Sequence, residues 1–209
     1  KMTIETAYKK GKSLLKNKVN NPEFEARILL QKILNINNTE FFLKKEVKNI
    51  SFLKFIKYLF FIHKRKKGIN LYHILKETEF YSIPLYVNKS VLIPRNETEE
   101  LVEIVLNKMN KNKFYHILDI GTGSGCISIA IAKNSNNVLI DAIDISKKAL
   151  KVAKKNIKKH SLYNRIKLVN KDISKFFSDK KYDIIISNPP YVKREEAKEL
   201  LQRNILSDP

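Results

Sequence analysis

Asp119-Ile120-Gly121-Thr122-Gly123-Ser124-Gly125 is the stretch that decides the fold of this 209-residue chain. It lies between an apolar run at 116–120 and a second apolar segment at 125–133, so it marks a turn from a strand into a helix. Glycines at such a turn let the backbone bend tightly and approach a ligand closely. The spacing is G-x-G-x-G rather than the G-x-G-x-x-G of nicotinamide-binding turns, and no Gly-Lys-Ser/Thr follows as in a P-loop.

Strands and helices alternate on the C-terminal side of this turn. We expect strands at 116–120, 138–145, 165–170 and 182–187, with helices at 125–133 and 146–160. Such alternation indicates a parallel sheet with right-handed crossovers, the doubly wound α/β class. The last strand is apolar enough to be buried on both faces. Sheets of this class bind ligands at the carboxyl ends of their strands, where the unusual residues of this chain fall.

Ser187-Asn188-Pro189-Pro190-Tyr191 follows the last expected strand. Neither proline can donate to a sheet ladder, so the strand ends here, and a residue before proline stays extended. The Asn188 amide has one acceptor and two donors, and the Pro189 carbonyl is free to accept. Together they can grip the NH2 of a planar amide or amine, while the ring of Tyr191 covers its flat face. The plainer alternative is a strand end followed by a proline turn.

One acid ends the second expected strand, and another follows the third. Asp144 can accept both hydroxyls of a ribose ring. A helix cap is the alternative role for either acid. That alternative suits Asp172 better than Asp144, because Ser146 is the better cap for the helix that follows Asp144.

Residues 1–75 form, by their pattern, a small all-helical domain. Helices are expected to begin near Thr3, at Asn21-Pro22, at Thr39 and at Ser51. The fourth is expected to carry one apolar face, made of Phe52, Phe55, Ile56, Leu59, Phe60 and His63.

The second domain, 76–209, opens with an alternating segment. Residues 79–87 alternate and contain a proline, which predicts two short edge strands. Asn96 is expected to cap the next helix, with Glu99 in a capping-box position.

Composition limits the classes of function. Hydrophobic content of 43% and charged content of 30% describe a globular protein, and neither a bilayer-spanning run nor a signal peptide is visible. One cysteine, Cys126, and four histidines without ligand spacing give no reason to expect a disulfide or a metal. A net charge of +20 has two interpretations. One is a phosphate-rich partner, for which the basic cluster at 63–67 is the first candidate contact. The other is a lysine-rich composition in which most of the charges lie on solvated helix faces.

The glycine loop, Asp144 and Asn188-Pro189-Pro190-Tyr191 together resemble the site of class I S-adenosylmethionine-dependent methyltransferases that act on nitrogen conjugated to a π-system. Val91-Leu92-Ile93-Pro94-Arg95-x-Glu97-Thr98-Glu99 ahead of the loop narrows the resemblance to the release factor glutamine methyltransferase family (PrmC, also called HemK). That family joins a helical N-terminal domain to the methyltransferase sheet through a β-hairpin. It methylates the glutamine side-chain nitrogen in the Gly-Gly-Gln loop of peptide chain release factors.

The resemblance implies a site residue by residue. S-adenosyl-L-methionine is the expected cofactor, bound by Asp119, Gly121, Thr122, Gly123, Ser124, Gly125, Asp144, Asp172, Ile173 and Asn188. The acid at 172 would accept from the adenine amino group, with Ile173 against the ring. The expected catalytic residues are Asn188, Pro189, Pro190 and Tyr191, with no metal. Residues 1–75 would recognise the release factor, and the enzyme would be a cytoplasmic monomer, or an organellar one if a targeting segment has been removed.

Three departures from the family pattern stand out. Asn96 replaces a usual proline, Lys76 replaces a usual glycine before the hairpin, and the chain ends at Pro209, where the family continues. We therefore expect a C-terminally truncated chain. Two other functions stay open: an adenine N6 or ribosomal-protein glutamine methyltransferase, and a non-catalytic protein that binds a factor or RNA.

Overall fold

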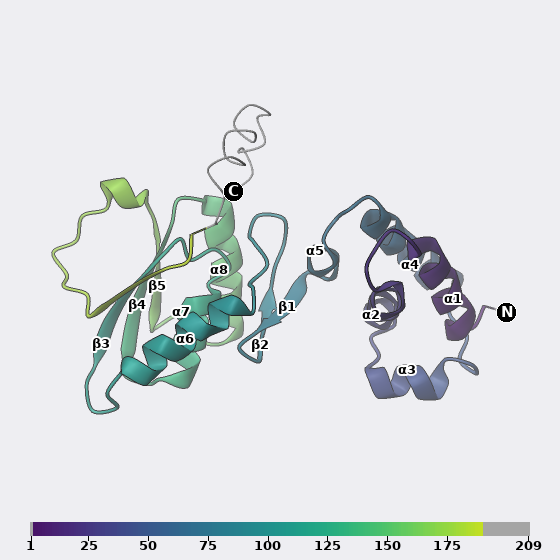
Figure 1. Ribbon diagram of the computed structural model, residues 1–209, viewed down its shortest axis with the longest axis horizontal. Coiled ribbons are helices and arrows are strands. Elements are labelled where there is room, and N and C mark those ends of the chain that lie inside the picture. The colour runs from purple at the N-terminus through teal and green to yellow at the C-terminus, as the bar shows by residue number, and fades with distance from the viewer. Residues whose placement is uncertain (1, 190–209) are drawn as a thin grey trace. The chain divides into compact units, whose positions relative to one another are not determined.

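The computed structural model describes residues 2–189 of the chain. Two of the expected catalytic residues, Pro190 and Tyr191, lie outside this range. The chain divides into two compact units, Lys1–Leu75 and Lys76–Pro209, and each is described by itself (Figure 1).

The first unit consists of helices. They are α1 (Ile4–Leu15), α2 (Pro22–Leu34), α3 (Asn38–Lys44), α4 (Phe52–Lys66) and the short α5 (Leu71–Leu75). The N-caps of the first four helices are Thr3, Asn21, Asn37 and Ser51, and each side chain accepts the backbone N–H of the residue three positions later. The third helix was expected to begin at Thr39, but Asn37 caps it and forms a reciprocal capping box with Glu40.

Helix α4 turns a different face inward from the apolar face read in the sequence. Tyr58 and Ile62 are fully buried, whereas Phe52 and Phe60 are exposed. Tyr58 lies over Gly11, where a Cβ would come within 1.8 Å of the phenol oxygen, and its Oη donates to the Ala26 carbonyl at 3.0 Å. The absence of a side chain at Gly11 thus leaves room for the Tyr58 ring, and this contact sets which face of α4 turns inward.

The second unit contains a hairpin and a parallel sheet with its helices. The hairpin is β1 (Glu77–Phe80) and β2 (Ile83–Tyr86). The further elements are α6 (Glu97–Lys108), β3 (Tyr115–Ile120), α7 (Cys126–Asn134), β4 (Val138–Asp144), α8 (Lys147–Lys159), β5 (Ile166–Asn170), the 3-10 turn η1 (Ile173–Lys175) and β6 (Ile184–Ser187). Four parallel strands form the sheet in the order β5-β4-β3-β6, which confirms the expected doubly wound class.

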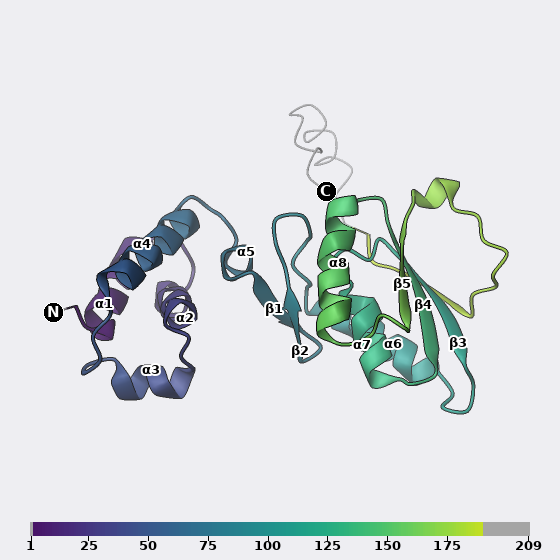
Figure 2. The same cartoon turned by 180° about the vertical axis from the view of Figure 1, so that it is seen from behind.

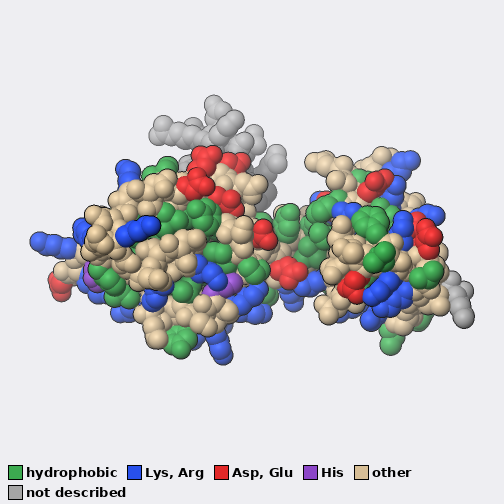
Figure 3. Space-filling view, turned by 90° about the horizontal axis from the view of Figure 1, so that it is seen from below, with side chains coloured by type: hydrophobic (Ala, Val, Ile, Leu, Met, Phe, Trp, Pro, Cys, Tyr) green, Lys and Arg blue, Asp and Glu red, His purple; other side chains and the backbone are tan. Residues whose placement is uncertain are grey.

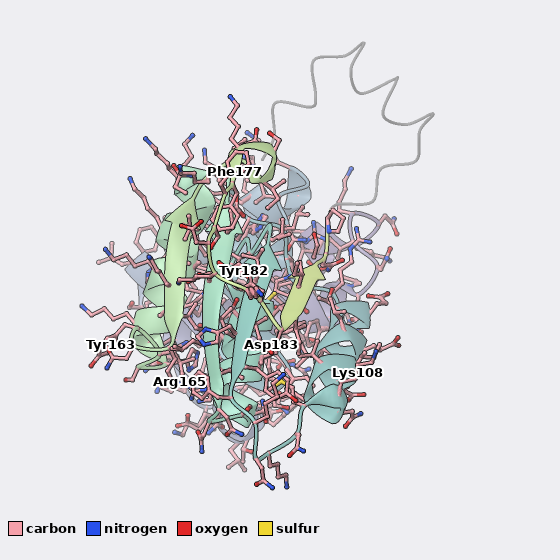
Figure 4. The ribbon with its side chains drawn as sticks, turned by 90° about the vertical axis from the view of Figure 1, so that its left-hand side faces the viewer. Lys108, Tyr163, Arg165, Phe177, Tyr182 and Asp183 are labelled. Atoms are coloured by element: carbon pink, nitrogen blue, oxygen red, sulfur yellow. The ribbon has the colours of Figure 1, made fainter. Side chains whose placement is uncertain are left out.

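Helices α6, α7 and α8 all lie on one side of this sheet, as the two opposite views show (Figures 1 and 2). Strand residues that face them, such as Ile117 and Ile140, are buried in the main core of the unit. Figure 4 looks onto the other side, where the sheet lies in front of the helices. There Ile185 is 63% exposed, although Ile186 beside it is only 3% exposed.

Strand β6 was expected to be buried on both faces, and this is wrong for the described residues. It is the end strand of the order β5-β4-β3-β6, and within residues 2–189 no helix packs on the side of Ile185. A continuous apolar run shows that a strand can be buried on both faces, but it does not show that a helix covers each face.

The expected cap of α6 is also wrong. Asn96 has helical backbone angles and makes no capping hydrogen bond with its side chain. The Glu99 carboxylate instead accepts the N–H of Tyr81 at 2.6 Å, at the two-residue turn between β1 and β2. This carboxylate is therefore used to tie the start of α6 to the hairpin rather than to satisfy its own helix end.

Candidate active site

The glycine loop is the turn between β3 and α7. Gly121, Gly123 and Gly125 all have positive φ, at 74°, 54° and 81°, a region that side chains other than glycine rarely adopt. A Cβ at Gly121 would meet nothing within 4 Å, whereas one at Gly125 would lie 3.3 Å from Cβ of Ala153 in α8. The first part of the loop therefore faces open space that a ligand can enter, and its end packs closely on a helix.

Asp119, the residue before the end of β3, lies beneath this loop and is only 1% exposed. Its Oδ2 accepts from the hydroxyls of Thr122 at 2.7 Å and Ser128 at 2.5 Å. Burial raises the pKa of Asp119 above its usual range, and those two hydrogen bonds oppose the shift. Its Oδ1 is buried without a hydrogen-bond partner among the described residues. A buried carboxylate oxygen in this position calls for a donor from a ligand or from water.

Asp144 ends β4, the neighbour of β3. Its Oδ2 accepts the N–H of Gly123 at 2.9 Å and its Oδ1 accepts the N–H of Ser146 at 2.8 Å. Ser146 caps α8, as expected, by accepting the N–H of Ala149. A carboxylate has about four acceptor positions, so Asp144 keeps capacity for a ligand's hydroxyl groups.

Asp172 and Ile173 follow β5 at the same edge of the sheet. The Asp172 carboxylate accepts both the N–H and the hydroxyl of Ser174, at 2.9 and 2.8 Å, so the capping role is the one present here. The hydrogen bond from the Ser174 N–H, and to a smaller extent the one from its hydroxyl, hold the pKa of Asp172 below its usual range. Ile173 exposes its side chain beside this acid.

Asn188 follows β6, next to the glycine loop. Ser187 pairs with Ile120 in the parallel register, so Asn188 comes level with the start of the loop at Gly121. Its Nδ2 donates to Oγ1 of Thr98, in the first turn of α6, at 2.8 Å. Pro189 is exposed beside it. The carboxyl edge of the sheet thus brings together the glycine loop, Asp144 and Asn188, as the sequence predicted.

Two residues at this edge were missed by sequence reasoning. Asn156 of α8 is fully buried; it accepts the N–H of Tyr86 at 2.7 Å and donates to the carbonyls of Tyr86 and Ser124, both at 2.9 Å. Asn170 donates to the carbonyls of Asp144 and Ile145 and joins the ends of β4 and β5. An Asn within the apolar stripe of a lysine-rich helix is the signal that could have revealed Asn156.

A hollow on the open side of the sheet lies away from this edge. Its lining includes Tyr163, Arg165 and Tyr182, which Figure 4 labels. Inside it the Asp141 carboxylate accepts from Lys180 at 2.9 Å and from the phenol of Tyr182 at 2.7 Å. Within residues 2–189, no three His, Cys, Asp or Glu side chains gather to hold a metal ion, and no helix is long and apolar enough to cross a membrane.

Comparison with known proteins matches both units. Residues 6–75 match the model of the PrmC N-terminal domain, and residues 95–208 match that of the methyltransferase small domain. A release factor glutamine methyltransferase of Flavobacterium psychrophilum is 40% identical over 86% of this chain and 63% of its own length. The one from Dictyoglomus turgidum is 36% identical over 93% of this chain and 70% of its own. Ribosomal protein L11 methylase of Lactobacillus delbrueckii subsp. bulgaricus, a solved structure, aligns with a TM-score of 0.41 at 24% identity, over 56% of this chain and 57% of its own.

The fold is a partial class I methyltransferase fold. It has a parallel sheet with a glycine loop after β3 and acids at the carboxyl edge, and the methyltransferase small domain model matches it. The chain belongs to the release factor glutamine methyltransferase family, with which it shares both units. It spans about two thirds or less of the length of the relatives matched first, down to 39% for a bifunctional methyltransferase of Rickettsia bellii.

Proposed function

We propose that this protein transfers a methyl group from S-adenosyl-L-methionine to the side-chain nitrogen of the glutamine in the Gly-Gly-Gln loop of peptide chain release factors. The observation that carries the proposal is Asn188-Pro189 at the end of β6, level with the glycine loop. The relatives named release factor glutamine methyltransferase support this class of substrate.

The residues present fit the cofactor. The open side of Gly121 and Gly123 gives room for close approach of a ligand to the backbone. The partnerless Oδ1 of Asp119 suits an ammonium group, which donates and is positively charged. Asp144 would accept from the ribose hydroxyls, and Asp172 with Ile173 would take the adenine. When bound, the cofactor supplies a methyl group on a positively charged sulfur.

The chemistry required of the protein is to make an amide nitrogen attack. That nitrogen is a poor nucleophile, because its lone pair is delocalised into the carbonyl. The Asn188 Oδ1 and the Pro189 carbonyl would accept the two protons of the substrate NH2 and hold the nitrogen in line with the methyl carbon. As the N–C bond forms and the S–C bond breaks, positive charge develops on the nitrogen and strengthens both hydrogen bonds. One of the two protons then leaves to water.

Other parts of the chain would serve the substrate. Tyr191 would stack on the amide plane, and Pro190 would belong to the same catalytic motif. Residues 1–75 would recognise the release factor, and the exposed rings of Phe52 and Phe60 on α4 offer an apolar contact surface for it. We further propose a monomer that acts in the cytoplasm, where release factors work.

A weak contact with RNA through basic side chains is the remaining part of the proposal. Basic side chains are spread over the face of both units drawn in Figure 3. Within 63–67, Arg65 already pairs with the Glu25 carboxylate at 2.5 Å, so the other members of that cluster would make the contact.

Replacement of the proposed acceptor tests the function. Asn188→Ala is expected to abolish turnover while the affinity for the cofactor stays within about twofold, because the glycine loop and the acids still hold the cofactor and the main role of Asn188 is on the substrate nitrogen. Turnover on a release factor and cofactor binding by calorimetry measure the two effects. Near-normal turnover in Asn188→Ala would show that the assignment is wrong.

A further inference from the structure

We propose that Thr98 is a positioning residue that fixes the orientation of the Asn188 amide, with Nδ2 held by the threonine hydroxyl and Oδ1 turned toward the reacting nitrogen. The inference rests on the proposed function, because that function makes Asn188 an acceptor. It assigns a role to one residue of the stretch 91–99, which the sequence singled out only as a family signature.

The contact joins two segments that are 90 residues apart in the chain. Thr98 is only 8% exposed, and its Oγ1 lies 2.8 Å from Nδ2 of Asn188. Among the described residues, this is the one hydrogen bond of the Asn188 side chain, and Oδ1 receives none. The donor end of the amide is therefore held, and no residue within 2–189 donates to the acceptor end.

Thr98 is itself held firmly. Its N–H donates to the Arg95 carbonyl at 3.0 Å, and the next residue, Glu99, accepts the N–H of Tyr81 in the hairpin. Two further residues of the same helix, Val102 and Val105, are buried in the main core of the unit. A β-branched side chain has few χ1 rotamers, so only a small number of positions relative to β6 are open to the hydroxyl.

Such support is needed because an Asn amide has no strong torsional preference of its own. The terminal torsion is broad and roughly two-fold, so rotation can exchange Oδ1 and Nδ2. With the amide reversed, its NH2 would face the NH2 of the substrate, and two donors would oppose each other. Neighbouring prolines restrict the backbone of Asn188 but not this torsion. In the observed orientation Nδ2 donates to the threonine hydroxyl, and this contact opposes free rotation of the amide while Oδ1 points away from Thr98.

Two matched variants separate the hydroxyl from the shape of the side chain. Thr98→Val keeps the branched shape and removes the hydroxyl, whereas Thr98→Ser keeps the hydroxyl. We expect Thr98→Val to lower kcat about tenfold or more, because small displacements of a reacting group have large effects on rate. The KM for the cofactor should stay within about twofold, and Thr98→Ser should retain most of the wild-type kcat. Wild-type kcat in Thr98→Val would overturn the inference, as would an equal loss in both variants.

A second readout does not depend on activity. In NMR spectra of the full chain, the side-chain NH2 signals of Asn188 are identified by their absence in Asn188→Ala. Their exchange with solvent should be slow in the wild type and in Thr98→Ser, and fast in Thr98→Val. Fast exchange in the wild type overturns the inference. Slow exchange in a wild-type protein that binds the cofactor but does not methylate glutamine supports the Thr98 contact and rejects the proposed function instead.

Discussion

At the scale of single residues, the buried carboxylate of Asp119 lowers the stability of the fold near the candidate site. Its carboxylate is buried, one of its oxygens has no partner within residues 2–189, and burial raises its pKa. The folded state therefore disfavours the charged form relative to the unfolded state, in which the pKa of Asp is about 3.9. The free energy of unfolding therefore falls as the pH rises from about 4 through the raised pKa of the folded state.

Asp119→Asn is expected to raise the free energy of unfolding at pH 7 and to weaken cofactor binding by about tenfold or more. The gain should shrink as the pH falls toward 4, because the carboxyl of the folded state is then protonated and its buried charge no longer costs stability. Denaturant unfolding across this pH range measures the first effect, and calorimetry measures the second. Asp172→Asn is the control: its pKa is lowered in the folded state, so it should show no gain at pH 7. A less stable Asp119→Asn at pH 7 would contradict this account.

Lys76 gives a second prediction at this scale. Its φ of 58° lies in the left-handed region, which glycine adopts without the strain that a Cβ brings. Lys76→Gly is expected to raise the free energy of unfolding by about 0.5–1 kcal/mol, the relief of strain less the added freedom of glycine in the unfolded chain. Thermal or denaturant unfolding measures the change. Lys76→Ala keeps the Cβ and should bring no comparable gain; equal stabilisation by both variants would point to the charge instead.

At the scale of elements, polar side chains of helices hold the parts of the site together. Asn156 of α8 bonds to both backbone groups of Tyr86 in β2 and to the Ser124 carbonyl in the glycine loop. Glu99 joins α6 to the hairpin, and Thr98 joins α6 to the end of β6. The hairpin, the glycine loop and the end of β6 are thus connected through two helices.

Asn156→Ala is expected to lower the free energy of unfolding by about 3 kcal/mol, because it leaves buried backbone groups of Tyr86 and Ser124 without partners. Cofactor affinity should fall as well, since Ser124 belongs to the glycine loop. Lys154→Ala, an exposed change on the same helix, is the matched control and should stay within about 0.5 kcal/mol of the wild type. A loss below about 1 kcal/mol in Asn156→Ala would mean that the loop does not depend on this residue.

The order of the elements and the position of the candidate site could be predicted from the sequence, because both depend on local sequence patterns. Apolar periodicity and glycine turns gave the order of strands and helices, and the carboxyl-edge rule brought Asp144 and Asn188 to one place. Contacts between side chains far apart in the chain have no local signature. Asn96 and Glu99 match a capping box in spacing, yet Glu99 has a partner in the hairpin that no local pattern reveals. The inward face of α4 likewise depends on Gly11, in a different helix.

At the scale of the whole molecule, the hydrophobic cores follow the division into two units. One cluster of buried side chains lies entirely within residues 1–75, and the two others lie within residues 76–189. Among the described residues, each unit thus buries its own apolar surface, which is the physical basis for independent folding.

Residues 1–75 are therefore expected to fold as an isolated chain. A single core of this size supports a stability of about 3 kcal/mol, with a helical circular-dichroism spectrum and one cooperative thermal transition. Gly11→Ala should remove or greatly weaken that transition, because a Cβ there overlaps the Tyr58 ring. A non-cooperative melt of the unmodified segment would show that the first unit depends on the second.

The central claim is that this protein methylates glutamine at the carboxyl edge of its sheet, beside Asn188. The most direct test is peptide-mapping mass spectrometry of a release factor after incubation with the full chain and S-adenosyl-L-methionine. One added methyl group on the glutamine of the Gly-Gly-Gln peptide, absent with Asn188→Ala, is the predicted result. An unmodified Gly-Gly-Gln peptide from a protein that binds the cofactor, or methylation of an adenine-containing oligonucleotide in its place, would contradict the account.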